Sequence, residues 1–213
     1  MTPRLSELTF GSFLVYPSRA DTDETARFKQ VVLDIKGDRF VHGKNMRWPE
    51  YTARRIVEKI PGSALEGYFP PDTVLVPLPR SGLLQKNALW PARRIADELV
   101  KAGLGERVET LIQRETPMRK SAVSGDRLSP AEHLKSFARV LPVQSRRFVF
   151  VDDIITRGST ALAAAWAILE VMPEAEVKTF AVARTTWEEP RGMVEIVVGK
   201  VVHEGGNFLK REP

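Results

Sequence analysis

The chain has 213 residues, which indicates one domain, or one domain with an elaboration. Its net charge of +5 and sequence pI near 9.6 suit either an anionic partner or an ordinary solvated surface. It contains no cysteine, so disulfides, thiolate metal sites, iron–sulfur clusters and thiol nucleophiles are excluded. Its three histidines, His42, His133 and His203, show no spacing typical of metal ligands, and we predict no metal site built from protein side chains alone.

The basic charge suits nucleic acid, a membrane surface or a phosphorylated small molecule, and charge alone does not choose among them. No stretch of about 18 apolar residues occurs, so no transmembrane segment is predicted. The N-terminal residues also lack the apolar core of a signal peptide. We therefore expect a cytoplasmic protein with no membrane association.

Hydrophobic periodicity divides the chain into helices and short apolar strands. The predicted helices are residues 25–37, 50–60, 91–100, a short helix that begins at Ser129, and 159–172. The predicted strands are residues 73–78, 108–112, 147–151, 177–183 and 194–202, and residues 114–128 are expected to form a long, polar and basic loop. Because strands and helices alternate from residue 73 onward, we predict an α/β fold with a mainly parallel, doubly wound sheet. Ligands of such sheets bind beyond the carboxyl ends of the strands.

The segment after the third predicted strand carries the strongest functional signal. Residues 156–160 read Thr-Arg-Gly-Ser-Thr and lead into an alanine-rich helix, which is typical of a phosphate site formed by backbone N–H groups at a helix N-terminus. Asp152 and Asp153 stand directly upstream, where they would repel a phosphate but accept hydrogen bonds from sugar hydroxyls. The combination therefore predicts a sugar phosphate as ligand.

Three other interpretations of this segment fit less well. The run lacks the spacing of a P-loop, no Walker A element precedes the acidic strand end, and the Gly-x-Gly-x-x-Gly nucleotide fingerprint is absent. The simplest alternative is a strand that ends in two acids and a helix capped by Ser159 or Thr160 without any ligand. Two adjacent acids are costly to place at a strand end without a partner, so we favour the ligand site.

Residues 149–160, Val-Phe-Val-Asp-Asp-Ile-Ile-Thr-Arg-Gly-Ser-Thr, resemble the phosphoribosyl pyrophosphate (PRPP) motif of type I phosphoribosyltransferases. The resemblance implies that Asp152 and Asp153 hold the ribose hydroxyls. It also implies that the following turn holds the 5′-phosphate; the turn residues are Thr156, Arg157, Gly158, Ser159 and Thr160. Enzymes of the hypoxanthine–guanine type carry an acid where this chain has Thr156, which counts against that subclass.

Two further segments fit the same family. Pro79, Arg80, Ser81 and Gly82 follow the first core strand, where the family has its pyrophosphate loop, although an ordinary proline-rich turn would also fit. The basic stretch from Arg114 to Phe137 resembles the flexible catalytic loop of the ComF-like branch, with Arg119 and Lys120 as candidate catalytic residues; the alternative is a solvated loop. His133 is expected to be a helix-surface or packing residue rather than a catalyst.

The resemblance covers roughly residues 28–184, starting near Ile35-Lys36-Gly37-Asp38, and departs from the ComF-like pattern in three places. The cysteine-rich zinc module is missing, residues 85–91 differ, and residues 185–213 have no counterpart. We expect a single domain, residues 1–213, with a helical N-terminal elaboration (1–60), a core (73–184) and a C-terminal extension (185–213). The N-terminal region and the C-terminal tail are expected to form a small hood.

The resemblance implies transfer of a phosphoribosyl group from PRPP to a nitrogen acceptor with release of pyrophosphate. Mg²⁺ would be the cofactor, bound mainly through PRPP. One alternative is an inactive PRPP-binding regulator or accessory protein, linked to competence and DNA uptake. Nucleic acid ranks below a small molecule as partner, because basic residues show little clustering and do not alternate with aromatic residues. The acceptor is not identified by the sequence, and a homodimer is left open.

Overall fold

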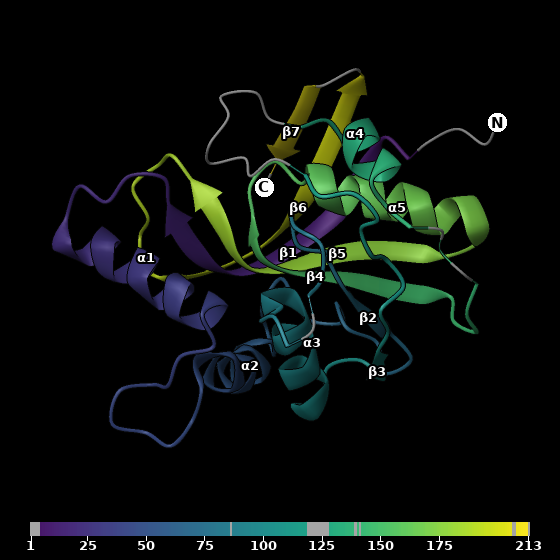
Figure 1. Ribbon diagram of the computed structural model, residues 1–213. Coiled ribbons are helices and arrows are strands. Elements are labelled where there is room, and N and C mark those ends of the chain that lie inside the picture. Colours follow the sequence, from purple (N-terminus) through teal and green to yellow (C-terminus); the bar gives the residue numbers. More distant parts are fainter. Residues whose placement is uncertain are drawn as a thin grey trace.

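The computed structural model describes residues 5–85, 87–118, 128–138, 140, 142–205 and 208–212 (Figure 1). Within these residues seven strands form one sheet in the order β3-β2-β4-β5-β1-β6-β7. The strands are β1 (Glu7–Pro17), β2 (Val74–Pro77), β3 (Arg107–Val108), β4 (Arg147–Ile155), β5 (Glu176–Thr186), β6 (Val194–Gly205) and β7 (Phe208–Glu212). Strands β3, β2, β4, β5 and β1 run parallel, while β6 and β7 are antiparallel additions at one edge. The predicted α/β class with a mainly parallel sheet is confirmed.

All five predicted helices are present, within a few residues of the expected ends. They are α1 (Asp23–Lys36), α2 (Trp48–Lys59), α3 (Pro91–Lys101), α4 (Pro130–Lys135) and α5 (Ser159–Val171). Helices α1 and α4 begin with capping boxes, formed by Thr22 with Thr25 and by Ser129 with Glu132. None of the helices that the structure describes is long and apolar enough to cross a membrane.

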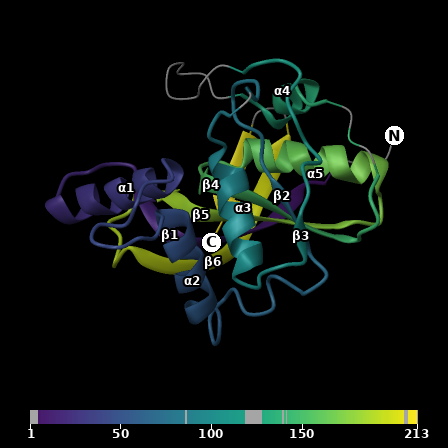
Figure 2. The ribbon, with the colours of Figure 1, turned by 60° about the horizontal axis from the view of Figure 1, so that its bottom comes forward.

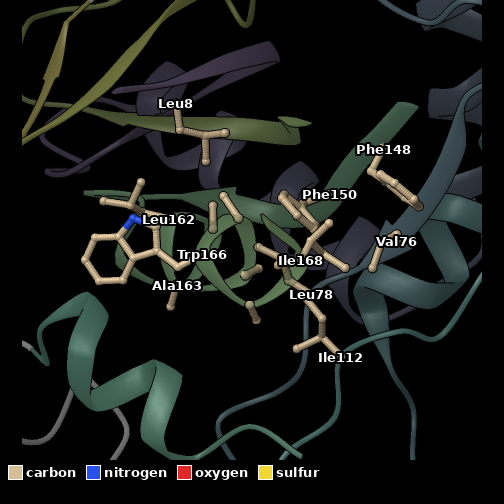
Figure 3. Close-up of a cluster of buried hydrophobic side chains, with 14 of the residues drawn as sticks. Leu8, Val76, Leu78, Ile112, Phe148, Phe150, Leu162, Ala163, Trp166 and Ile168 are labelled. Atoms are coloured by element: carbon tan, nitrogen blue, oxygen red, sulfur yellow. The ribbon is translucent and has the colours of Figure 1, made fainter. Parts of the chain in front are cut away.

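The helices cover both faces of the sheet. Alternating residues of β4 show this directly, because Phe148 and Phe150 pack with α5 whereas Val149 and Val151 pack with α1, α2 and α3. Figure 1 shows α4 and α5 on one side, Figure 2 brings α2 and α3 in front of the sheet, and Figure 3 shows α5 side chains meeting those of β1, β2 and β4. The core is therefore two apolar layers separated by the sheet.

The strand β1 was not predicted. It lies between β5 and β6, so residues 1–60 supply a central strand as well as the helices α1 and α2. Gly11 lies where a Cβ atom would come within 2.8 Å of Leu65, so the loop that carries Leu65 and Tyr68 can pack closely on the sheet. Strand β7 was also not predicted, and β3 is shorter than expected. Within the expected C-terminal extension, β6 and β7 form one edge of the sheet.

The chain changes direction across the sheet between β2 and β4. The connection after β2 runs through α3 outward to β3, whereas the connection after β4 runs through α5 to β5 on the other side. Helices α3 and α5 lie on opposite faces, so the carboxyl ends of β2 and β4 flank a topological switch point. In open α/β sheets such a point is the usual place for a ligand.

Candidate functional site

A cavity of about 430 Å³ lies at the carboxyl end of β4. It is lined by the β4 end, the following turn and the start of α5, with single residues from β1, α1, α4 and neighbouring segments. The lining residues are Tyr16, Lys36, Leu78, Leu128, His133, residues 152–161, Thr179 and Thr185. The cavity coincides with one side of the switch point, where the sequence placed its strongest functional signal.

The turn that leads into α5 leaves the helix N-terminus open to a ligand. Gly158 is the N-cap residue with a left-handed φ of 84°, and no side chain of the described residues caps the helix, in contrast to α1 and α4. A Cβ atom on Gly158 would lie 2.6 Å from a methyl group of Val201, so only glycine fits here. The first-turn N–H groups and the helix dipole are therefore available to an anion.

Asp152 and Asp153 enter the cavity from opposite faces of β4. The Oδ1 of Asp152 accepts from the Asp153 amide at 2.9 Å, and the Oδ1 of Asp153 accepts from the Ile154 amide at 2.8 Å. Burial, and then the negative charge of Asp153, raise the pKa of Asp152 well above its usual range. Asp152 is therefore a carboxylate whose charge is costly until a ligand supplies hydrogen bonds or positive charge.

Lys36, in the last turn of α1, provides a cation for this acidic pair. Its Nζ lies 2.7 Å from Oδ2 of Asp153. Burial by itself would lower the pKa of Lys36, but the charge of Asp153 and the hydrogen bond to it raise that pKa above its ordinary value. A ligand that uses Asp153 must share this carboxylate with Lys36 or displace the ammonium group.

His133 and Arg114 form a buried pair beside the cavity. The Arg114 guanidinium donates from Nε to the carbonyl oxygen of Arg80 at 2.7 Å and from Nη1 to the Ser136 hydroxyl, and its Nη2 lies 3.0 Å from Nδ1 of His133. Because a guanidinium only donates, Nδ1 of His133 accepts and the proton of the neutral ring resides on Nε2. Burial, followed by the charge of Arg114, lowers the pKa of His133 to about 4. His133 thus lines the cavity as a neutral ring.

The structure brings together part of the predicted site. Asp152, Asp153 and the turn residues 156–160 line one cavity. Residues 79–82 follow β2, the strand next to β4, but they do not line the cavity. Two of their carbonyl groups accept hydrogen bonds from elsewhere in the chain. Arg114 donates to the carbonyl oxygen of Arg80, and the Met118 amide donates to the carbonyl oxygen of Ser81 at 2.7 Å. Arg119 and Lys120 lie outside the described residues.

Among the lining residues that were not predicted to belong to the site, three carry titratable groups, namely Tyr16, Lys36 and His133. Lys36 lies in the stretch 35–38 that we quoted for its resemblance, so a signal for it was present, but no role was attached to it. His133 lies in the stretch 114–137 that was quoted for its resemblance to a catalytic loop, but no role in the site was attached to it. In the described part of the chain, no group of three or more carboxylate or imidazole side chains could hold a metal ion.

Comparison of the chain with protein-family models gives no match, and comparison with curated proteins gives no match either. The resemblance to type I phosphoribosyltransferases therefore remains a prediction from the motif residues.

Proposed function

We propose that this protein is a phosphoribosyltransferase of the type I kind, which binds PRPP and transfers its 5-phosphoribosyl group to a nitrogen nucleophile. The observation that carries the proposal is the cavity beyond β4, in which two adjacent carboxylates and an uncapped helix N-terminus face the same space. A sugar phosphate needs both chemistries, hydrogen-bond acceptors for its hydroxyls and donors for its phosphate.

In this proposal the 5′-phosphate binds the turn before α5. The N–H groups of the turn and of the first helical residues donate to it, and the hydroxyls of Thr156, Ser159 and Thr160 add further donors. The ribose diol binds Asp152 and Asp153. The raised pKa of Asp152 favours a ligand that donates hydrogen bonds to this acid, because such donors stabilise the charge that burial disfavours.

The reaction would break the bond between the anomeric carbon and pyrophosphate while a nitrogen nucleophile attacks that carbon. The ribose then carries positive charge, which the carboxylates of Asp152 and Asp153 would stabilise. Mg²⁺ would be held mainly by PRPP oxygens, with these two carboxylates as the oxygen ligands that this chain can add, and it would neutralise charge on the leaving pyrophosphate. Residues 79–82, Arg119 and Lys120 are the candidates for contacts to pyrophosphate.

Calorimetric titration of the full chain with PRPP and Mg²⁺ tests the binding step. We expect heat from binding in the wild type, at least a tenfold loss of affinity in Asp153→Asn, and no change in Asp72→Asn. Asp72 is a suitable control because it is an exposed acid that pairs with Arg147 away from the cavity. Absence of PRPP binding by the wild type, or equal affinity in Asp153→Asn, would refute the proposal.

Release of pyrophosphate tests the chemical step. The wild type is incubated with PRPP, Mg²⁺ and a panel of nitrogen acceptors, and pyrophosphate is measured with time. We expect release with at least one acceptor, and none with Asp153→Asn. PRPP binding without release by any acceptor would instead support the inactive PRPP-binding regulator.

A further inference from the structure

The two antiparallel edge strands, called here the β6–β7 pair, lie directly behind the turn that leads into α5. Val201 of β6 and Arg211 of β7 are opposite each other in the register of this pair. Both residues contact the turn, one by packing and the other by hydrogen bonds. No described residue of the β6–β7 pair lines the cavity, so the pair contacts the turn from the side away from the ligand space.

The packing contact is between Val201 and Gly158. Val201 is fully buried, and its methyl groups occupy the position that a Cβ atom on Gly158 would need. The left-handed backbone at Gly158 therefore lies flush against β6. This contact fixes how closely the turn approaches the sheet edge.

The polar contact is made by the guanidinium of Arg211. Its Nη1 donates to the carbonyl oxygens of Ile155 at 2.8 Å and Thr156 at 3.0 Å, and its Nη2 donates to the carbonyl oxygen of Thr185. One side chain thus joins the end of β4, the first residue of the turn and the end of β5. A guanidinium suits this arrangement because its planar fork offers several donors in fixed directions.

Among the described residues no carboxylate forms an ion pair with Arg211, and its guanidinium lies 5.6 Å from the centre of the Phe10 ring. Burial, and then the charge of Arg184, lower the pKa of Arg211 to about 10, which still leaves it protonated near neutral pH. A half-buried cation with which no described carboxylate pairs favours an anion on the other side of the turn.

The direction of the carbonyl groups links this contact to the ligand. In a trans peptide the C=O of one residue and the N–H of the next point in opposite directions. Holding the carbonyl oxygens of Ile155 and Thr156 toward Arg211 therefore directs the N–H groups of Thr156 and Arg157 away from the β6–β7 pair. Residues 156 and 157 line the cavity, and the pair does not.

We propose that Arg211 is a positioning residue for the phosphate end of the ligand: it holds the carbonyl groups of Ile155 and Thr156 so that the turn presents its N–H groups to the cavity. This inference rests on the proposed function, because it takes a sugar phosphate as the ligand of the turn. It assigns a role to residues 185–213, for which the sequence resemblance offered none.

The test compares Arg211→Gln and Arg211→Lys with the wild type and with Lys210→Gln. Lys210 is the exposed neighbour on the same strand and pairs with Glu212, so it controls for loss of a positive charge from β7. The first measurement is amide hydrogen exchange of the ligand-free proteins. In Arg211→Gln we expect at least fivefold faster exchange at residues 156–162, and unchanged exchange in α3, which reports general stability. Faster exchange spread over the whole sheet would indicate a merely structural role and overturn the inference.

The second measurement is the affinity for ribose 5-phosphate and for PRPP with Mg²⁺. We expect at least a tenfold loss for both ligands in Arg211→Gln, a smaller loss in Arg211→Lys, and wild-type affinity in Lys210→Gln. If Arg211→Gln does not fold, Arg211→Lys decides the matter, and wild-type affinity in that variant overturns the inference. A wild type that binds neither ligand refutes the proposed function and this inference together, whereas a wild type that binds while Arg211→Gln binds equally well refutes this inference alone.

Discussion

Protonation of His133 should destabilise the folded protein in mildly acidic solution. The ring is buried, and its Nδ1 accepts from the Arg114 guanidinium. Its pKa falls from the ordinary 6.5 to about 4 in the folded state, chiefly through burial and then through the charge of Arg114. Because the unfolded chain binds this proton more readily, stability is fully present above pH 6.5 and is lost as the pH falls toward 4.

The size of the loss follows from the two pKa values. A pKa shift of this size means that His133 lowers the free energy of unfolding by at most about 3 kcal/mol at low pH. At pH 5.5 the same linkage lowers the free energy of unfolding by about 1.4 kcal/mol relative to high pH, whereas at pH 7.5 it lowers it by about 0.1 kcal/mol. A difference of about 1.3 kcal/mol between the two pH values is large enough to measure by urea unfolding.

The assay is urea unfolding at pH 7.5 and pH 5.5 of the wild type, His133→Asn and His42→Asn. The asparagine carbonyl in His133→Asn keeps an acceptor for Arg114 but cannot take up a proton. We expect His133→Asn to lose about 1.3 kcal/mol less free energy of unfolding between the two pH values than the wild type does. His42 is exposed, so His42→Asn should show the wild-type loss. Equal losses in the wild type and His133→Asn would refute the argument that His133 is held neutral.

Two further predictions concern stability at the candidate site. Asp152→Asn should raise the urea midpoint of the ligand-free protein at pH 7.5. The pKa of Asp152 is raised in the folded protein, so its negative charge lowers the free energy of unfolding once the pH exceeds the ordinary pKa of an aspartate. The gain in midpoint from the substitution should therefore shrink toward pH 4. The same variant should bind PRPP more weakly, so a lower urea midpoint at pH 7.5 would contradict the electrostatic argument. Gly158→Ala should cost about 2–4 kcal/mol in urea unfolding, from a left-handed residue and a clash with Val201. In a double-mutant cycle Val201→Ala should remove part of that cost, and strict additivity of the two substitutions would contradict the clash.

Local patterns in the sequence were sufficient for most of the fold. Helix α3 was predicted from an apolar stripe with clear boundaries, and helix α5 from an almost fully apolar run with clear boundaries. Strand β1 was missed because Gly11 and Ser12 interrupt its apolar residues, and both are accommodated only by packing from elsewhere in the chain. Strand β7 is short and polar, and it is a strand because it pairs with β6.

The candidate site divides in the same way. Asp152, Asp153 and the turn before α5 are contiguous, so their chemistry could be predicted together. Lys36 reaches Asp153 only because α1 packs on one face of β4, and His133 reaches the cavity from the other face. Contacts of this kind depend on the topology, which no local pattern contains.

The position of β1 also has a consequence for how the molecule comes apart. Among the described strands, the β6–β7 pair is joined to the other five by backbone pairing with β1 alone, and β1 pairs with β5, which is distant in sequence. Any fluctuation that peels β1 from β5 must carry β6 and β7 with it, so the first and last strands behave as one cooperative unit. Besides the contacts of Val201 and Arg211, the strands behind the turn before α5 are therefore held to the rest of the sheet by one ladder, formed between β1 and β5.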